Sequence, residues 1–243
     1  MAISIDLNAD GSGNGVDLQG LLADFDANFS KGSFNWGQFL NGGFFDGPQY
    51  YLSDEDSSSS YTDGFLATTG SGDEFSYDIG THQIVGNLDA LSFGETLVQD
   101  GNGDYYLSDS AADISGLNLS NADTGTVLTA LYSGDSSELQ SVFASQGVAI
   151  NGSTGNDTIG GWAGDDVLTG NGGADTFEFD TSGNFGDDTV TDFTDGTDLL
   201  DIDFNSVTVA SANGGADTLI THANGTITLT GVDFNDIDAT DFV

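Results

Sequence analysis

Residues 152–178 read GSTGNDTIG, GWAGDDVLT and GNGGADTFE, three consecutive units of nine residues. Each unit has glycine at its first and fourth positions, aspartate at the sixth and an apolar residue at the eighth. The second and third positions vary between units. Glycine supplies the backbone conformations of a tight turn and lets main-chain carbonyls approach an ion closely. The nine-residue spacing of these positions predicts a turn and a short strand in every unit, so that successive units stack as half-coils of a parallel β-roll.

The same units predict calcium ligands. A fourth, offset unit, GNFGDDTVT over residues 183–191, keeps the spacing. The aspartates supply carboxylate oxygens and the glycines main-chain carbonyls, and both are hard ligands suited to Ca²⁺. Solvated Asp/Gly turns are the alternative, which three abutting units with four positions in phase disfavour. The predicted calcium-site residues, through side chain or backbone, are Asp157, Asp166, Asp175, Asp188, Gly152, Gly155, Gly161, Gly164, Gly170 and Gly173.

The charge of the chain excludes several classes of partner. There are 40 acidic residues against one basic residue, Lys31, which gives a formal net charge of −39. Such a chain repels nucleic acid and anionic membrane surfaces, so neither is expected as a partner. A compact state with this charge needs salt or bound cations, which suits a calcium-rich extracellular environment. A hydrophobic fraction of 37% still predicts a packed core.

Cysteine, membrane spans and an N-terminal signal are all missing from the sequence. Without cysteine, neither disulfides nor thiolate metal sites are possible. No stretch approaches the roughly 20 apolar residues that span a bilayer, so no membrane insertion is expected. The start, MAISIDL, lacks the basic and long apolar regions of a secretory signal peptide, and an extracellular protein then needs another export route.

The C-terminal region offers that route. After the repeats come DDTVTDFTDGTDLLDI at residues 187–202 and LTGVDFNDIDATDFV at residues 229–243. This arrangement resembles the C-terminal domain of the serralysin metalloproteases and other type I (ABC transporter) secretion substrates, which carry RTX calcium-binding repeats. The resemblance implies export by type I ABC machinery through an uncleaved C-terminal signal. The protease half is absent, because the chain has only His82 and His222 and no H-E-x-x-H.

The pattern differs in residues 1–150. An amphipathic helix is expected over residues 14–29, a second over 125–132, and a third from Asp135, where Glu138 completes a capping-box-like start. Strands are expected between Gly/Asp/Ser turns, and loops at the Asn41-Gly-Gly and Ser57–Ser60 stretches. The expected strands are residues 50–52, 75–79, 83–88, 96–99 and 105–107. Strands grouped together with helices at the ends predict an α+β sandwich with its helices on one side of the sheet.

One segment of this half, FSYDIGTHQIVGNLDALSFGETL at residues 75–97, resembles the HasA-type hemophores, secreted bacterial proteins that take up haem. The likeness covers most of residues 2–146, and GNLDALSFG is its most specific part. It implies a curved antiparallel sheet with helices on one side. Hemophores are exported by type I systems, to which the C-terminal half points separately.

The resemblance also implies a haem site. A tyrosinate that matches Tyr77 would ligate ferric haem iron, and its oxygen would be hydrogen-bonded by His82. From the residues alone, Tyr77 is an ordinary strand tyrosine and His82 a turn residue. The loop that supplies a second axial histidine in the family has none between Ser30 and Gln38. Either Tyr77 alone holds haem while Phe34 and Trp36 pack on the porphyrin, or this scaffold has lost haem binding.

Three functions are compatible with the sequence. The first is a secreted haem-binding protein with three domains: a hemophore-like domain (1–150), a calcium-binding β-roll (151–194) and a β-rich secretion region (195–243). Its partners would be haem, calcium ions, the type I machinery and an outer-membrane haem receptor. The second is a calcium-binding adhesion or matrix protein on the same scaffold. The third is a secreted hydrolase, which ranks last because no nucleophile elbow or metal triad is present. No enzymatic activity is therefore expected.

Overall fold

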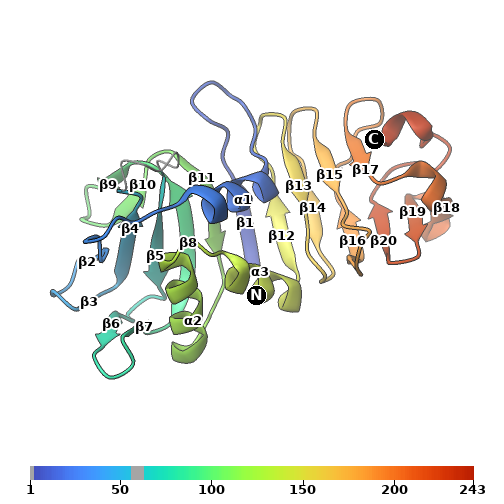
Figure 1. Cartoon of the computed structure of the whole chain (residues 1–243). Helices are drawn as coiled ribbons and strands as arrows, with labels where there is room; N and C mark the ends of the chain where they lie inside the picture. Colours follow the sequence, from blue (N-terminus) through green and yellow to red (C-terminus); the bar gives the residue numbers. More distant parts are fainter. Residues whose placement is uncertain (1–2, 56–62) are drawn as a thin grey trace. The chain divides into compact units, whose positions relative to one another are not determined.

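The computed structural model describes residues 3–55 and 63–243 (Figure 1). The expected loop at Ser57–Ser60 lies outside the described residues. The chain forms two compact units, one of Met1–Gln19 with Gln140–Val243 and one of Gly20–Leu139. We call them the repeat unit and the inserted unit, since the second interrupts the first in sequence, and describe each by itself.

The inserted unit is built on an antiparallel sheet of five strands in the order β11-β8-β5-β4-β2. These are β2 (Gln38–Leu40), β4 (Gln49–Ser53), β5 (Gly64–Thr69), β8 (Leu88–Gly94) and β11 (Ser110–Ser115). A smaller antiparallel sheet has the order β3-β6-β7, with β3 (Asp46–Gly47), β6 (Phe75–Asp78) and β7 (Gln83–Val85). A separate hairpin of the inserted unit is formed by β9 (Leu97–Gln99) and β10 (Tyr105–Leu107).

The large sheet of the inserted unit buries a different cluster on each face. Phe65 stands opposite Phe93 on the neighbouring strand, and the ring of Phe25 from helix α1 (Leu18–Asn28) lies 6.5 Å and 5.5 Å from them. Leu66, the next residue on β5, points to the other face because side chains alternate along a strand. There it packs with Leu40 and Leu107 in a second buried cluster. The sheet is therefore apolar on both sides.

The remaining helices are α2 (Asn121–Tyr132) and α3 (Ser137–Gln146). Helix α2 buries Val127, Leu128 and Leu131, and its Gly125 lies against β7, where an added Cβ would come 3.1 Å from Gln83 Oε1. A mixed α and β architecture with an antiparallel sheet and three helices confirms that part of the expected fold. No helix of residues 3–55 and 63–243 is long and apolar enough to cross a bilayer.

Element boundaries differ from the expectation for local reasons. The first helix begins at Leu18 instead of residue 14, because the preceding residues are extended: the Val16 amide donates to Asp157 Oδ1 (2.5 Å) and its carbonyl accepts from the Thr158 amide (2.9 Å). Helix α2 begins at Asn121, earlier than residue 125. The strand expected over residues 83–88 ends at Val85, because Gly86 has φ +134°, which no ordinary strand residue adopts.

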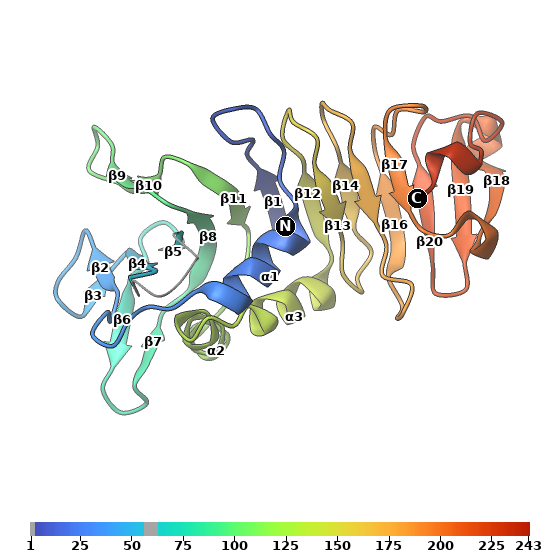
Figure 2. The ribbon, with the colours of Figure 1, turned by 45° about the horizontal axis from the view of Figure 1, so that its top comes forward.

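The repeat unit consists of two rows of parallel strands (Figures 1 and 2). One row pairs β1 (Ile3–Leu7), β12 (Val148–Asn151), β14 (Val167–Thr169), β16 (Gly186–Val190) and β20 (Gly225–Leu229) in parallel. The other row pairs β13 (Thr158–Gly160), β15 (Thr176–Glu178) and β17 (Leu199–Asp201). The strands β18 (Thr208–Ala212) and β19 (Asp217–His222) extend the first row beyond β20 in antiparallel fashion.

The apolar residue of each nonapeptide faces the core of the repeat unit. Ile159, Phe177 and Leu200 are paired in register in one row and fully buried. Leu168 and Val190 are equivalent in the other row. The eighth position of the motif therefore encodes the core, as the phase of the repeats predicts.

Two adjacent glycines allow a test of why the motif needs glycine. Gly173 has φ +139° and an added Cβ would fall on the Gly155 carbonyl of the neighbouring turn, whereas a Cβ on Gly172 meets nothing closer than 4.0 Å. We expect Gly173→Ala to destabilise the repeat unit by at least about 1–3 kcal/mol through backbone strain. Gly172→Ala should leave stability nearly unchanged. Urea unfolding of both variants measures this, and equal midpoints would contradict the stacking of these turns.

Candidate functional site

Tyr77 and His82 meet across the end of the β6–β7 hairpin. Tyr77 lies on β6 opposite Ile84, and His82 is the last residue of the turn. The Tyr77 hydroxyl lies 2.9 Å from His82 Nδ1, a hydrogen bond in which the phenol donates when Nδ1 carries no proton. The two residues that the family resemblance singles out are thus in direct contact.

The turn itself positions His82. Its backbone takes φ +59°, uncommon for a residue with a side chain, and its amide donates to the Asp78 carbonyl (2.8 Å). The Asp78 carboxylate accepts from the amides of Gly80 (2.7 Å) and Thr81 (3.3 Å). These bonds, that of Gly80 most, hold the pKa of Asp78 below its usual value, and the nearby His82 adds to the effect.

Exposed apolar side chains surround Tyr77. The Phe45 ring stacks on the Tyr77 ring with 6.1 Å between centroids, and the Phe45 carbonyl accepts from the Tyr77 amide (2.9 Å). The Phe44 ring packs edge-on against the Phe45 ring. Phe44 is 86% exposed, and Ile79 at the hairpin tip is 72% exposed. Several large apolar groups on a polar surface are typical of a ligand site. Phe44, Phe45 and Ile79 were not predicted as site residues, although an aromatic pair in a Gly-rich loop was the available signal.

Phe34 and Trp36 lie in the segment that joins α1 to β2. They are 91% and 71% exposed, yet the backbone between them is fixed. The Trp36 carbonyl accepts from the Tyr50 hydroxyl (2.8 Å), and the Asn35 amide group donates to the Ser53 carbonyl (2.9 Å). Among the described residues, no hydrogen bond or ring contact joins Phe34 or Trp36 to the Tyr77–His82 pair. The segment therefore presents two aromatic rings to solvent from a rigid support.

Lys31, the one basic side chain of the sequence, belongs to the same segment. Its Nζ lies 4.5 Å from the Tyr132 ring centroid and 5.6 Å from that of Trp36. Both distances allow a cation–π interaction. Lys31 thus steadies the segment through aromatic rings.

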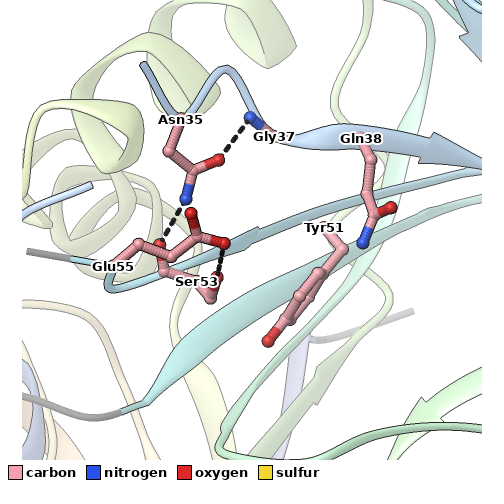
Figure 3. A pocket seen from close by; sticks show the side chains of 6 residues that line it. All are labelled: Asn35, Gly37, Gln38, Tyr51, Ser53 and Glu55. Carbon is pink, nitrogen blue, oxygen red and sulfur yellow. Dashed lines mark hydrogen bonds between the residues drawn. The ribbon is translucent and has the colours of Figure 1, made fainter. Parts of the chain in front are cut away.

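An open pocket adjoins this segment, lined by Asn35, Gly37, Gln38, Tyr51, Ser53 and Glu55 (Figure 3). Its lining is mostly polar: Asn35 Oδ1 accepts from the Gly37 amide (3.0 Å), and the Ser53 hydroxyl donates to Glu55 Oε1 (3.2 Å). Burial raises the pKa of the Tyr51 phenol. Neither Tyr77 nor His82 lines this pocket, and its polar walls do not suit a large apolar ligand.

The predicted calcium aspartates form two ladders inside the repeat unit. Asp175 Oδ1 accepts from the Asp157 amide (2.8 Å), and Asp198 Oδ1 accepts from the Asp175 amide (3.0 Å). In the second ladder, Asp188 Oδ1 accepts from the Asp166 amide (2.9 Å). All five side chains are buried. Asp198 was not predicted, although it precedes buried Leu200 by two residues just as Asp157 precedes Ile159.

The glycines make room for these carboxylates. At the first position of the second and third units, a Cβ on Gly161 or Gly170 would collide with the carboxylate of its own unit, and one on Gly152 would come 2.9 Å from Asp157 Oδ2. At the fourth position, Gly155 lies against the backbone of residues 13–15 and Gly164 against that of Gly147. The two glycine positions thus serve different contacts.

Burial changes the acidity of the ladder. It raises the pKa of Asp175 to about 6 and that of Asp188 to about 8, and neighbouring aspartates add to both shifts. Desolvated carboxylates of like charge favour a neutralising cation. Carboxylates and glycine carbonyls are a donor set that fits Ca²⁺. Within residues 3–55 and 63–243, no three His, Asp or Glu side chains converge as a complete metal cluster, so an ion would take further ligands from the backbone.

Comparison with known proteins gives a family match. The family model described as Heme-binding protein A (HasA) matches residues 8–183. No curated protein sequence matches the chain.

Solved structures of low similarity also align. The apo hemophore HasA from Yersinia pestis aligns over 59% of this chain and 87% of its own, with 19% identity and a TM-score of 0.48. The holo form aligns over 59% and 89%, with 20% identity and a TM-score of 0.47. The AlgE6R2 subunit of the Azotobacter vinelandii mannuronan C5-epimerase aligns over 40% and 76%, with 27% identity and a TM-score of 0.31.

The acceptor bonds of Asp78 predict how the turn that carries His82 responds to pH. Because the folded-state pKa of Asp78 is lowered, its contribution is present at neutral pH and is lost as the pH falls through that pKa. We expect the Gly80 and Thr81 amides to lose protection only in acid, below the usual range of aspartate. NMR titration measures this. Asp78→Asn keeps an acceptor oxygen and should abolish the pH dependence; an unchanged titration in that variant would contradict the assignment.

Proposed function

Because the chain belongs to the heme-binding protein A (HasA) family, we propose that it is a secreted hemophore that captures ferric haem for iron acquisition. The family consists of haem-carrying proteins and not of enzymes. The hydrogen bond between the Tyr77 hydroxyl and His82 Nδ1 is the observation that carries this proposal.

The pair has the chemistry that a ferric haem ligand requires. Bound haem would supply an Fe³⁺ centre, for which an anionic phenolate oxygen is a suitable ligand. Tyrosine loses its proton near pH 10 in water, so a neighbouring acceptor is needed at neutral pH. The imidazole nitrogen Nδ1 of His82 lies within hydrogen-bond distance of the phenol oxygen and can accept that proton. Tyr77 is then the iron ligand and His82 the residue that keeps its oxygen available.

The surroundings of Tyr77 suit the porphyrin. Phe45 and Phe44 extend the apolar surface from the tyrosine ring, and Ile79 stands at the tip of the same hairpin. A flat apolar macrocycle that covers such groups removes apolar surface from water, which stabilises the complex by about 25 cal/mol per Å². Phe34 and Trp36 offer two further rings for porphyrin packing. Since residues 30–38 hold no histidine, Tyr77 is the sole protein ligand in this proposal.

Haem titration tests the proposal. Wild-type protein should give the visible spectrum of tyrosinate-ligated ferric haem. Tyr77→Phe keeps the ring that stacks on Phe45 but removes the ligand oxygen, and should lose most of the binding. His82→Gln removes the proton acceptor and should weaken binding by about 10–100-fold, in a pH-dependent way.

Tyr106→Phe is the matched control, because Tyr106 is a half-exposed tyrosine on β10 and lies outside the β6–β7 hairpin. It should bind haem as the wild type does. If Tyr77→Phe and wild type give the same spectrum and affinity, the likeness to hemophores is one of fold alone. A calcium-binding adhesion or matrix protein would then be the better assignment.

We further propose that the nonapeptides are RTX repeats that bind calcium, with residues 151–194 as a β-roll between a haem-binding domain (1–150) and a secretion region (195–243). The parallel rows of strands, the buried aspartate ladders and the glycines that accommodate them support this proposal. The ligands would be Asp157, Asp166, Asp175 and Asp188 with carbonyls of the repeat glycines. Calcium would neutralise carboxylates that otherwise repel one another across the stacked turns.

Adjacent aspartates on β16 test calcium binding. Asp188 is buried, whereas Asp187 is exposed. Calcium at 100 times its Kd should stabilise the wild type by about 2.7 kcal/mol. Asp188→Asn keeps an oxygen to accept from the Asp166 amide but loses the charge, so the calcium-dependent gain should shrink; Asp187→Asn should retain it. Urea unfolding followed by circular dichroism, in chelator and in calcium, measures both, and equal gains would contradict the ligand assignment.

Export and delivery complete the proposed role. We infer that type I ABC machinery exports the chain through its uncleaved C-terminal region and that an outer-membrane receptor accepts the haem. The acidic-then-apolar end, Asp241-Phe-Val243, is the part that would carry the export signal.

A further inference from the structure

The C-terminal tail pairs with strand β17. Phe242 forms a parallel bridge with Leu200, and the Val243 amide donates to the Leu200 carbonyl (3.1 Å). The Phe242 ring lies 5.0 Å from that of Phe204, and Ile237 is buried. The short helix η3 (Ala239–Asp241) comes directly before Phe242 in this tail.

At this junction, one carboxylate oxygen is buried without a partner. Asp241 is 1% exposed, and its Oδ2 accepts from the Asp238 amide (2.8 Å) in a capping box. Its Oδ1 has no hydrogen-bond partner among the described residues. A buried carboxylate oxygen without a donor costs free energy, because it loses its hydrogen bonds to water and no protein hydrogen bond replaces them.

The group that this carboxylate does face is another acid. The side chain of Asp195 lies within hydrogen-bonding reach of that of Asp241. Asp236 and Asp238 add negative charge from the same tail. Two carboxylates in contact, with one oxygen buried and unpaired, repel each other until a cation or a shared proton intervenes.

We propose that Asp195 and Asp241 bind a calcium ion that joins the turn before β17 to the C-terminal tail. One divalent cation neutralises both carboxylates, whereas a shared proton neutralises one. Asp241 Oδ1 supplies the inner ligand, and the exposed Asp195 leaves the outer side open for entry and for water. Calcium accepts such an irregular, water-completed oxygen shell more readily than magnesium does. No third acidic side chain converges here among the described residues, so carbonyls and water fill the remaining positions.

The carboxylates of this site are not those of the aspartate ladder. Neither Asp195 nor Asp241 occupies a sixth position of the repeat, and the ladder continues through Asp198, whose Oδ2 accepts from the Thr194 amide (2.8 Å). Calcium at the tail therefore does not require calcium in the ladder.

Hydrogen exchange of the Val243 amide in the full chain tests the site, because that amide opens only when the tail leaves Leu200. Calcium at 10 times its Kd should slow exchange of Val243 about tenfold in the wild type. Asp195→Asn should lose this gain. In chelator the same variant should exchange more slowly than the wild type, because the repulsion is gone. Asp233→Asn removes one charge from the tail at an exposed position whose carboxylate accepts from the Asn235 amide, and should behave as the wild type.

The Thr176 amide, which donates to the Asp157 carbonyl inside the ladder, reports on the repeats in the same experiment. Calcium protection of Val243 that Asp195→Asn removes would support the tail site whether or not Thr176 responds. An equal gain in Asp195→Asn and wild type, or no gain at Val243 in the wild type, would overturn it. In either of those cases a response at Thr176 would still leave calcium in the repeats standing.

Discussion

The buried aspartates are the constraint on which the repeat unit depends. Asp157 and Asp166 each accept from an amide of their own turn, that of Ser153 or Trp162, and each donates its own amide to the aspartate of the next coil. The same group therefore closes one turn and stacks it on another. Replacing one such carboxylate would leave amides without acceptors in two places. The position of the buried carboxylate also explains why glycine recurs at the first position of the repeat, where a Cβ would occupy the space of that carboxylate.

The inserted unit works by a different principle. Its sheet is apolar on both faces, and the rings of Phe25, Phe65 and Phe93 form a rigid base. The groups that face solvent, such as Phe44 and Ile79, lie in loops outside that base. The stability of this sheet thus allows its loops to expose apolar side chains, although their exposure to water costs free energy. The Tyr77–His82 pair lies beside these groups at the tip of a hairpin fixed by Asp78.

The sequence allowed prediction of features that repeat and missed those that depend on distant contacts. The phase of the nonapeptides predicts that Ile159, Leu168 and Phe177 face a common core, because one position repeats every nine residues. The extended segment at Val16 could not be predicted, since its partner is Asp157, 141 residues away. The role proposed for Tyr77 rests on family resemblance, as nothing in the local pattern separates it from an ordinary strand tyrosine. The exposure of Phe44 and Phe45 is a tertiary property that composition does not encode.

The pairing of β1 with β12 has a mechanical consequence. This ladder runs from Ile3↔Val148 to Asp6↔Asn151 and holds the two arms of the repeat unit together on either side of residues 20–139. It acts as a non-covalent clasp around a long chain segment. Forming this pairing closes a loop of about 140 residues, and the entropic cost of closure rises only slowly with loop length. As long as the clasp holds, a nick in an exposed loop of the inserted unit would cut the chain without parting its two pieces.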